Sequence, residues 1–159
     1  MTAKVAPFGI ALLVFLVDRL TKIWIDRSLT AFDEWVIIPG FFNIIHAENR
    51  GMAFSLMAEW SSRWREFFLI GVSGAVLLLI ATMLWQARDA LQRWALVLVL
   101  GGAMGNLYDR VVRGSVTDFL DFHVAGYHWP TFNVADSAIT VGAILLASEL
   151  LFAHKRKAA

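Results

Sequence analysis

The sequence contains no cysteine, and this absence removes several kinds of chemistry at once. Disulfides, thiolate–zinc sites and a nucleophilic cysteine are excluded, although the cellular compartment does not follow from it. An excess of one charge is also missing: 14 lysines and arginines against 13 acidic residues leave a net charge of +1. Because nucleic-acid binding depends on many basic side chains, the composition predicts no nucleic-acid partner.

Familiar cofactor and nucleophile motifs are absent too. The sequence has no G-x-G-x-x-G or P-loop pattern, no H-E-x-x-H pair and no G-x-S-x-G elbow, so no cofactor is expected and a serine mechanism is disfavoured. Asp121, His123 and His128 resemble a metal cluster. The five-residue spacing of the histidines is not a standard helix-face pair, so interfacial histidines are favoured and no metal is predicted.

The sequence is rich in apolar residues. Of its 159 residues, 58% are hydrophobic and the mean hydropathy is +0.63, above the usual soluble composition. Apolar runs at about 5–25, 67–85, 94–110 and 132–153 are each long enough to cross a bilayer. We predict an all-α membrane protein of one domain, residues 1–159, with four transmembrane helices. No cleavage pattern follows the first run, so it is not interpreted as a signal peptide.

Basic residues in short segments set the predicted orientation. Lys4, Arg88, Arg93 and the basic cluster at 155–157 all lie on the side that carries both termini. Density of positive charge in short loops marks the cytoplasmic side, so both termini are predicted to be cytoplasmic. All seven tryptophans lie near span ends or in the outer loops, as their interfacial preference predicts.

The segment 26–65 is predicted to lie outside the membrane. Its Pro39-Gly40 dipeptide suits a type II turn between two apolar runs, which predicts a short hairpin. Farther on, Trp60, Trp64 and Phe67 recur at helical spacing beside charges, which predicts a short interfacial helix at 57–68. An ordinary extracytoplasmic loop is the alternative for the whole segment.

Two carboxylates, Asp118 and Asp136, lie between the third and fourth runs, where the topology returns both to the outer face. Two carboxylates held close share a proton, so one can activate water while the other acts as an acid. This pair predicts a membrane-embedded hydrolase. The alternatives are that Asp136 only caps a helix, that Asp118 and Asp109 are solvated loop acids, and that Asp109-Arg110 is an interfacial anchor.

Two further features lie within the apolar runs. Asp18 and Lys22 are one helical turn apart and can pair, either as a structural pair or as part of the site. Gly101 and Gly105 match the G-x-x-x-G pattern, which predicts close packing between helices.

Four motif blocks occur in one order along the chain: D-R-L-T-K at 18–22, N-R-G-M-A-F at 49–54, G-G-A-M-G-N-L-Y-D-R…G-S-V-T-D-F at 101–119, and F-N-V-A-D at 132–136. Together they resemble the bacterial lipoprotein signal peptidases, also called signal peptidase II. The resemblance implies a multi-pass aspartic endopeptidase of the inner membrane with its active site near the outer face. It would remove the signal peptide from diacylglyceryl-modified prolipoproteins, cutting before the lipidated cysteine.

The resemblance also implies roles for single residues. The catalytic pair falls on Asp118 and Asp136. The positions that would bind substrate or support the site are Asp18, Lys22, Asn49, Gly102, Asn106, Asp109, Arg110, Asn133 and Ala135. The implied fold adds a small extracytoplasmic β-sheet and an interfacial helix. Implied partners are diacylglyceryl prolipoproteins, membrane lipids and cyclic peptide inhibitors of the globomycin type; Asp121 and both histidines stay outside the site.

Two rival functions belong to other classes. A small proton- or ion-coupled transporter could use the same acids as relay groups, although the sequence shows no inverted repeat. A non-catalytic membrane scaffold would explain the helices but not the paired motifs.

Overall fold

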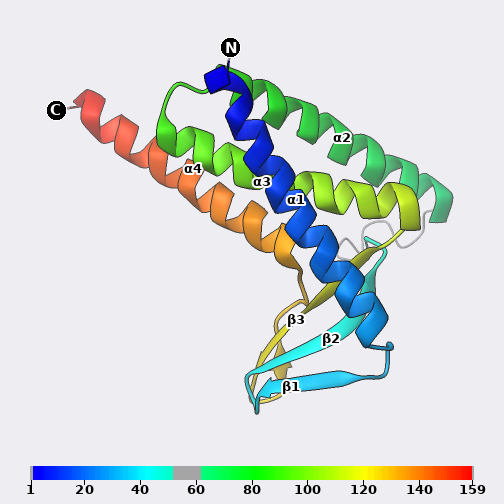
Figure 1. Ribbon diagram of the computed structural model, residues 1–159. Helices are drawn as coiled ribbons and strands as arrows, with labels where there is room; N and C mark the ends of the chain where they lie inside the picture. Colours follow the sequence, from blue (N-terminus) through cyan, green and yellow to red (C-terminus); the bar gives the residue numbers. More distant parts are fainter. Residues whose placement is uncertain (1, 52–61, 159) are drawn as a thin grey trace.

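The computed structural model describes residues 2–51 and 62–158, which form four helices and a four-stranded antiparallel sheet (Figure 1). The helices are α1 (Thr2–Ser28), α2 (Ser62–Gln86), α3 (Ala90–Arg113) and α4 (Val134–Ala158). The strands are β1 (Glu34–Ile38), β2 (Phe42–Asn49), β3 (Val116–Val124) and β4 (Tyr127–His128). The sheet lies at one end of the helix bundle, and the start of α1 and the end of α4 lie toward the other end (Figure 1).

Helix α3 is the centre of the bundle, because it contacts each of the other three helices. Glycines allow the close approach. A Cβ atom on Gly101 would lie 2.7 Å from the carbonyl oxygen of Ala11 in α1, and one on Gly102 would collide with the carbonyl oxygen of Ala135 in α4. The sequence prediction of close helix packing at Gly101 and Gly105 is therefore confirmed.

Two helices among the described residues are long and apolar enough to cross a membrane, Arg63–Gln86 and Ala90–Arg113. In the first, only 11% of the apolar window is buried, against 50% in the second. An apolar surface that the protein itself leaves uncovered suits contact with lipid. The other two predicted spans, now within α1 and α4, do not meet this criterion among the described residues, so a four-span topology stays a prediction.

The hairpin predicted around Pro39-Gly40 is confirmed. Strands β1 and β2 pair antiparallel, and the N–H of Phe41 donates a 3.0 Å hydrogen bond to the carbonyl of Ile38 across the turn. Gly40 has φ +73°, the left-handed conformation that the third position of a type II turn requires.

Two other expectations about the outer region need correction. No strand is predicted from the sequence between the third and fourth apolar runs, yet residues 116–124 and 127–128 form β3 and β4, and β3 pairs with β2. A separate interfacial helix at 57–68 is wrong from Ser62 onward, since these residues are the first turns of α2. Trp60 lies outside the described residues. The sheet is fixed to α1 by an apolar contact of Phe119 with Ile25 and Leu29.

Candidate active site

Asp118 lies on β3, only 3% exposed, with both carboxylate oxygens engaged. Asn49, at the end of β2, donates a hydrogen bond of 3.0 Å from Nδ2 to Oδ2 of Asp118. Asn133, just before α4, donates one of 2.7 Å from Nδ2 to Oδ1. The pairing of β2 with β3 places Asn49 at this site, because Ala47 and Asp118 are partners in the register. Asp118 is thus not a solvated loop acid.

Asp136 lies in the first turn of α4 and takes part in a reciprocal cap. The N–H of Asp136 donates a 2.9 Å hydrogen bond to Oδ1 of Asn133, and the N–H of Asn133 donates one of 3.3 Å to Oδ2 of Asp136. This is the capping-box arrangement, with Asn and Asp in place of Ser and Glu. The remaining oxygen, Oδ1, accepts a 2.7 Å hydrogen bond from Nδ2 of Asn106 in α3.

Asn133 connects the two carboxylates. Its side-chain oxygen accepts from the backbone of Asp136, while its side-chain nitrogen donates to Asp118. The side chain is fully buried, and Nδ2 also lies 3.3 Å from the carbonyl of Thr117 and from Oδ1 of Asn106. Asn133 thereby bonds to the carboxylate of Asp118 through its side chain and to the carboxylate of Asp136 through its backbone N–H, so both belong to a single polar network.

A cluster of ion pairs lies behind Asn106. The buried Nζ of Lys22 is 2.8 Å from Oδ2 of Asp18, 2.8 Å from Oδ2 of Asp109 and 3.0 Å from Oδ1 of Asn106. The contact with Asn106 is a hydrogen bond, and the contacts with the two carboxylates are ion pairs. Arg19 pairs with the other oxygen of Asp109, so every charge in this cluster has an opposite partner.

The same cluster fixes the start of α4. Oδ1 of Asp18 accepts a 2.9 Å hydrogen bond from the N–H of Ala135, which precedes Asp136. A Cβ atom on Gly105 would collide with Oδ2 of Asp18, so glycine leaves the room that the carboxylate occupies. Sequence reasoning assigned the pair Asp18/Lys22 and the close packing at Gly105, but it missed Arg19, although Arg19 lies inside the first motif block.

Burial and a neighbouring charge set the acidity of Asp118. Burial raises the pKa of Asp118 to about 6, and the charge of Asp136 also raises it, while the hydrogen bonds from Asn49 and Asn133 oppose the shift. Since carboxyl pKa values near 6 allow proton transfer in both directions near neutral pH, Asp118 is suited to acid–base chemistry.

A polar cavity of about 310 Å³ opens beside Asn49 and Arg110. Arg50, Arg65 and Arg113 also line it, which makes the cavity basic. Arg110 donates to the carbonyl of Asn106 at 3.3 Å, and its Nε is buried without a hydrogen-bond partner among the described residues. The cavity wall does not include the two aspartates, but Asn49 lies between the cavity and Asp118.

An apolar groove of about 380 Å³ lies on the other side, between α1 and α4. It is lined by Val14 and Val17 of α1, Leu98 of α3, and Val134 and Ala138 of α4, among others. Because Val134 lies two residues before Asp136, the groove begins next to the dyad.

All eleven residues assigned from the sequence therefore lie in or beside one site. Asp118, Asp136, Asn49, Asn106 and Asn133 make up the amide-bonded network, while Asp18, Lys22 and Asp109 form the ion-paired cluster behind it. Gly102 and Ala135 are in close contact where α3 meets the start of α4, and Arg110 lines the polar cavity.

Comparison with known proteins identifies the family. A model of the family described as signal peptidase (SPase) II matches residues 10–152. The chain belongs to the signal peptidase II family. The lipoprotein signal peptidase of Solibacter usitatus is 49% identical over 154 residues, which is 96% of this chain and 93% of that protein. The corresponding protein of Yersinia enterocolitica is 40% identical over 152 residues, or 94% and 89% of the two chains.

Solved structures agree with this assignment to signal peptidase II. One described as a bacterial membrane enzyme, determined in meso at 1.9 Å resolution, has a TM-score of 0.81 at 32% identity and covers 92% of both chains. A second, at 2.3 Å, has a TM-score of 0.83 at 30% identity and covers 96% of this chain and 91% of its own. Signal peptidase II is a membrane protease that removes signal peptides from prolipoproteins, and its mechanism is of the aspartic type. Family membership thus favours the protease over the transporter and the scaffold.

Proposed function

We propose that Asp118 and Asp136 are the catalytic pair with which this signal peptidase II hydrolyses diacylglyceryl-modified prolipoproteins. The observation that supports this most directly is the position of Asn133: its side-chain amide donates to the carboxylate of Asp118 on β3, and its backbone N–H donates to the carboxylate of Asp136 at the start of α4. Two carboxylates so connected, one of them nearly buried, have the equipment for peptide hydrolysis without a cofactor.

In the proposed reaction the ionised member of the pair removes a proton from a water molecule. The hydroxyl oxygen attacks the scissile carbonyl carbon while the protonated member donates its proton to the carbonyl oxygen. The tetrahedral intermediate then breaks at the C–N bond, and the amine leaves with a proton returned from the pair. Because its pKa is raised to about 6, Asp118 is the better candidate to hold the shared proton.

The asparagines keep this pair in place without fixing its charge. Asn49 and Asn133 hold Asp118, and Asn106 holds Asp136. We assign them, together with the ion-paired cluster around Lys22, a positioning role. Asn106 joins the two groups, since it accepts from Lys22 and donates to Asp136.

The substrate has an apolar part and a polar part, and the site offers a matching surface for each. We place the signal-peptide helix or the diacylglyceryl chains in the apolar groove between α1 and α4, where membrane lipids also fit. The basic cavity beside Arg110 would receive polar groups of the substrate backbone. A cyclic peptide of the globomycin type would compete for the same space.

The proposed setting is a single domain with four membrane spans in the bacterial inner membrane. The sheet end would be extracytoplasmic and both termini cytoplasmic. The start of α1 and the end of α4 lie away from the sheet, as this topology requires (Figure 1). A reporter fused after Ala159 should be cytoplasmic and one inserted near Ser62 extracytoplasmic; finding both on one side contradicts the topology.

The decisive experiment replaces one carboxylate at a time. Asp118→Asn and Asp136→Asn should each lower cleavage of a lipidated prolipoprotein by about 10²–10⁴-fold, because each removes one acid–base group. Asp33→Asn, a matched change at an exposed loop acid, should cleave normally. With protein levels equalised, normal cleavage by either dyad variant would contradict the assignment.

A further inference from the structure

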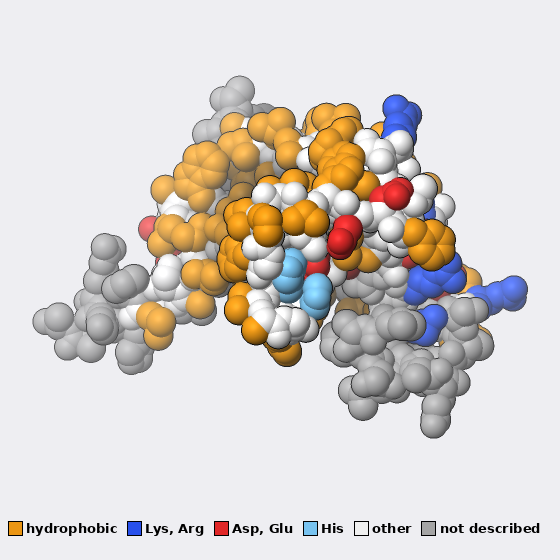
Figure 2. All heavy atoms as spheres, turned by 90° about the horizontal axis from the view of Figure 1, so that it is seen from below, with side chains coloured by type: hydrophobic (Ala, Val, Ile, Leu, Met, Phe, Trp, Pro, Cys, Tyr) orange, Lys and Arg blue, Asp and Glu red, His pale blue; other side chains and the backbone are white. Residues whose placement is uncertain are grey.

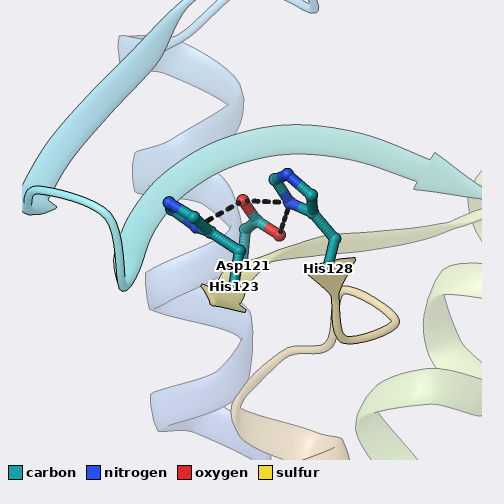
Figure 3. Close-up of side chains that lie close together, drawn as sticks. All are labelled: Asp121, His123 and His128. Atoms are coloured by element: carbon teal, nitrogen blue, oxygen red, sulfur yellow. Dashed lines mark hydrogen bonds and ion pairs between the residues drawn. The ribbon is translucent and has the colours of Figure 1, made fainter. Parts of the chain in front are cut away.

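Beyond the proposed active site, the far end of β3 carries a second group of polar side chains. Asp121, His123 and His128 lie together there, and the ligand atoms that they offer are within 4.8 Å of one another (Figure 3). Nδ1 of His128 is 2.9 Å from Oδ1 of Asp121, and Nδ1 of His123 is 3.6 Å from Oδ2 of Asp121. Both imidazoles thus turn toward one carboxylate.

The hairpin explains how histidines five residues apart come together. Val124 pairs with Tyr127 across a two-residue turn in which Ala125 and Gly126 have φ of +51° and +82°. Two positive φ values are typical of the type I′ turn, which closes the tightest hairpins. His123 and His128 are therefore cross-strand partners on one face of the sheet, and Asp121 shares that face because side chains alternate along a strand. The five-residue spacing does not bring two histidines together on a helix face, but it does so across a two-residue hairpin turn.

Two buried polar atoms on these paired strands have no hydrogen-bond partner among the described residues. Nδ1 of His123 is buried without a hydrogen-bond partner, since 3.6 Å is too long for one. Oδ1 of Asn43, the β2 residue paired with Asp121, is likewise buried without one. Polar atoms of this kind are costly to leave unsatisfied, so their presence indicates a missing partner.

We propose that Asp121, His123 and His128 bind a divalent transition-metal ion of the zinc type. Two imidazole nitrogens and one carboxylate oxygen suit zinc and its neighbours rather than magnesium or calcium, which prefer oxygen ligands. Donors bound to one tetrahedral zinc are about 3.3 Å apart, given metal–ligand bonds of roughly 2.0–2.2 Å. Oδ2 of Asp121 is 3.1 Å from Nδ1 of His128 and 3.6 Å from Nδ1 of His123, and these two separations bracket that value.

The surroundings complete the site. Side chains of Asp121 and His123 are 6% and 14% exposed, whereas that of His128 is 56% exposed. The two less exposed ligands, Asp121 and His123, would form the fixed half, and the exposed ring of His128, which stacks on His123, would turn toward the ion. We assign the fourth position to a water molecule, whose hydrogen bond Oδ1 of Asn43 would accept because Asn43 is the cross-strand partner of Asp121. The two histidines lie next to acidic side chains, and hydrophobic side chains border part of this polar patch (Figure 2).

An apolar wall supports the buried half. His123 also lines a cavity of about 400 Å³ formed with aromatic side chains that include Phe41, Phe122 and Trp129. An apolar shell beside a metal site limits the access of water and holds the ligands in orientation. The metal would link the two-residue strand β4 to β3. Its ligand Asp121 lies three residues after Asp118 on β3.

The test is Zn²⁺ binding by the full chain in detergent, without an affinity tag and after removal of metal with a chelator. Titration calorimetry should find one Zn²⁺ per chain, and Zn²⁺ should raise the unfolding temperature. His128→Gln changes an exposed side chain and should still fold, yet it should bind at least about 10-fold more weakly. His123→Gln should behave alike, whereas His46→Gln, a change on the same sheet outside the cluster, should bind as the parent does.

A second readout reports the ligands themselves. Co²⁺ in the same site should give visible absorption bands of a tetrahedral complex, and these bands should be lost in His128→Gln. Absence of binding at millimolar Zn²⁺, or equal affinity of parent and His128→Gln, would overturn the proposal. Because neither readout uses cleavage, the outcome is independent of the assignment of Asp118 and Asp136.

Discussion

Two pairs of carboxylates belong to one network but are held by different chemistry. Asp18 and Asp109 share the ammonium group of Lys22, at 2.8 Å from each. Asp118 and Asp136 accept hydrogen bonds from asparagine side chains and backbone N–H groups instead.

The difference separates structural acids from acids that can react. In the Lys22 cluster each carboxylate lies beside a cation and the opposite charges offset one another, so these acids are suited to a structural role. An amide N–H stabilises a carboxylate but also remains bonded to a protonated carboxyl, which keeps a second oxygen lone pair. The asparagine-held pair can therefore exchange protons without losing its position.

The largest effect is expected when both members of the amide-held pair are changed. Asp118→Asn/Asp136→Asn should lose cleavage by about 10²–10⁴-fold, little more than either single variant, because groups that act as one unit are strongly non-additive. Cleavage rates on a lipidated prolipoprotein, at matched protein levels, measure this. A double variant with the product of both losses would show two independent groups.

Breaking the ion-paired cluster should affect stability instead. Lys22→Ala leaves two buried carboxylates without their shared cation, and breaking a buried pair typically costs about 3–5 kcal/mol. Asp18→Ala/Lys22→Ala should be less damaging than Lys22→Ala alone, since Asp109 keeps Arg19. Thermal unfolding in detergent compares the two. If the double variant were the less stable one, the cluster would not act as a neutral structural unit.

Asn133 allows the cap of α4 to be separated from the bridge between the carboxylates. Asn133→Ser keeps a good N-cap oxygen but removes the N–H that binds Asp118. The cleavage rate should fall about 10-fold or more, and the unfolding temperature should fall as well, since hydrogen bonds to charged groups contribute about 1.5–3 kcal/mol. Asn133→Ala, the matched control, should lose the cap as well and about 1 kcal/mol more of stability.

The smallest effect is a displacement of the pH profile. The pair is active with one proton, so kcat/KM should fall as pH rises through the pKa of Asp118, about 6, where the last proton leaves. The hydrogen bond from Asn49 lowers this pKa, so Asn49→Ala should raise it and move the alkaline limb to higher pH. Asp33→Asn should leave the limb in place; an Asn49→Ala limb at lower pH would contradict the assignment to Asp118.

Much of the helical framework and of the site could be predicted from sequence, because apolar runs and motif blocks are local signals. The hairpin at Pro39-Gly40 was similarly local. Strand β3 was missed because Val116–Val124 follows a helix directly and pairs with β2, about 70 residues earlier, so its partner leaves no mark nearby. The run V-T-D-F-L-D-F-H-V, rich in β-branched and aromatic residues and followed by Ala125-Gly126, was the available signal.

The contacts within the site could not be predicted from the sequence for a similar reason. The pairing of Arg19 with Asp109 and of Asn49 with Asp118 joins residues separated by 90 and 69 positions, respectively. Such distances depend on how helices and sheet are packed, and no periodicity records them. The cross-strand relation of His123 and His128 became visible only with the hairpin.

The capping box at the start of α4 connects the proposed proton transfer to the stability of a helix. Oδ2 of Asp136 accepts the N–H of Asn133, so the oxygen that would gain and lose a proton during cleavage also holds the first turn of a helix. A proton on that oxygen leaves one lone pair for the N–H, so the hydrogen bond of the cap would be kept but weakened. Each turnover would therefore briefly weaken the hydrogen bonding of the first turn of α4, beside the groove in which we place the substrate.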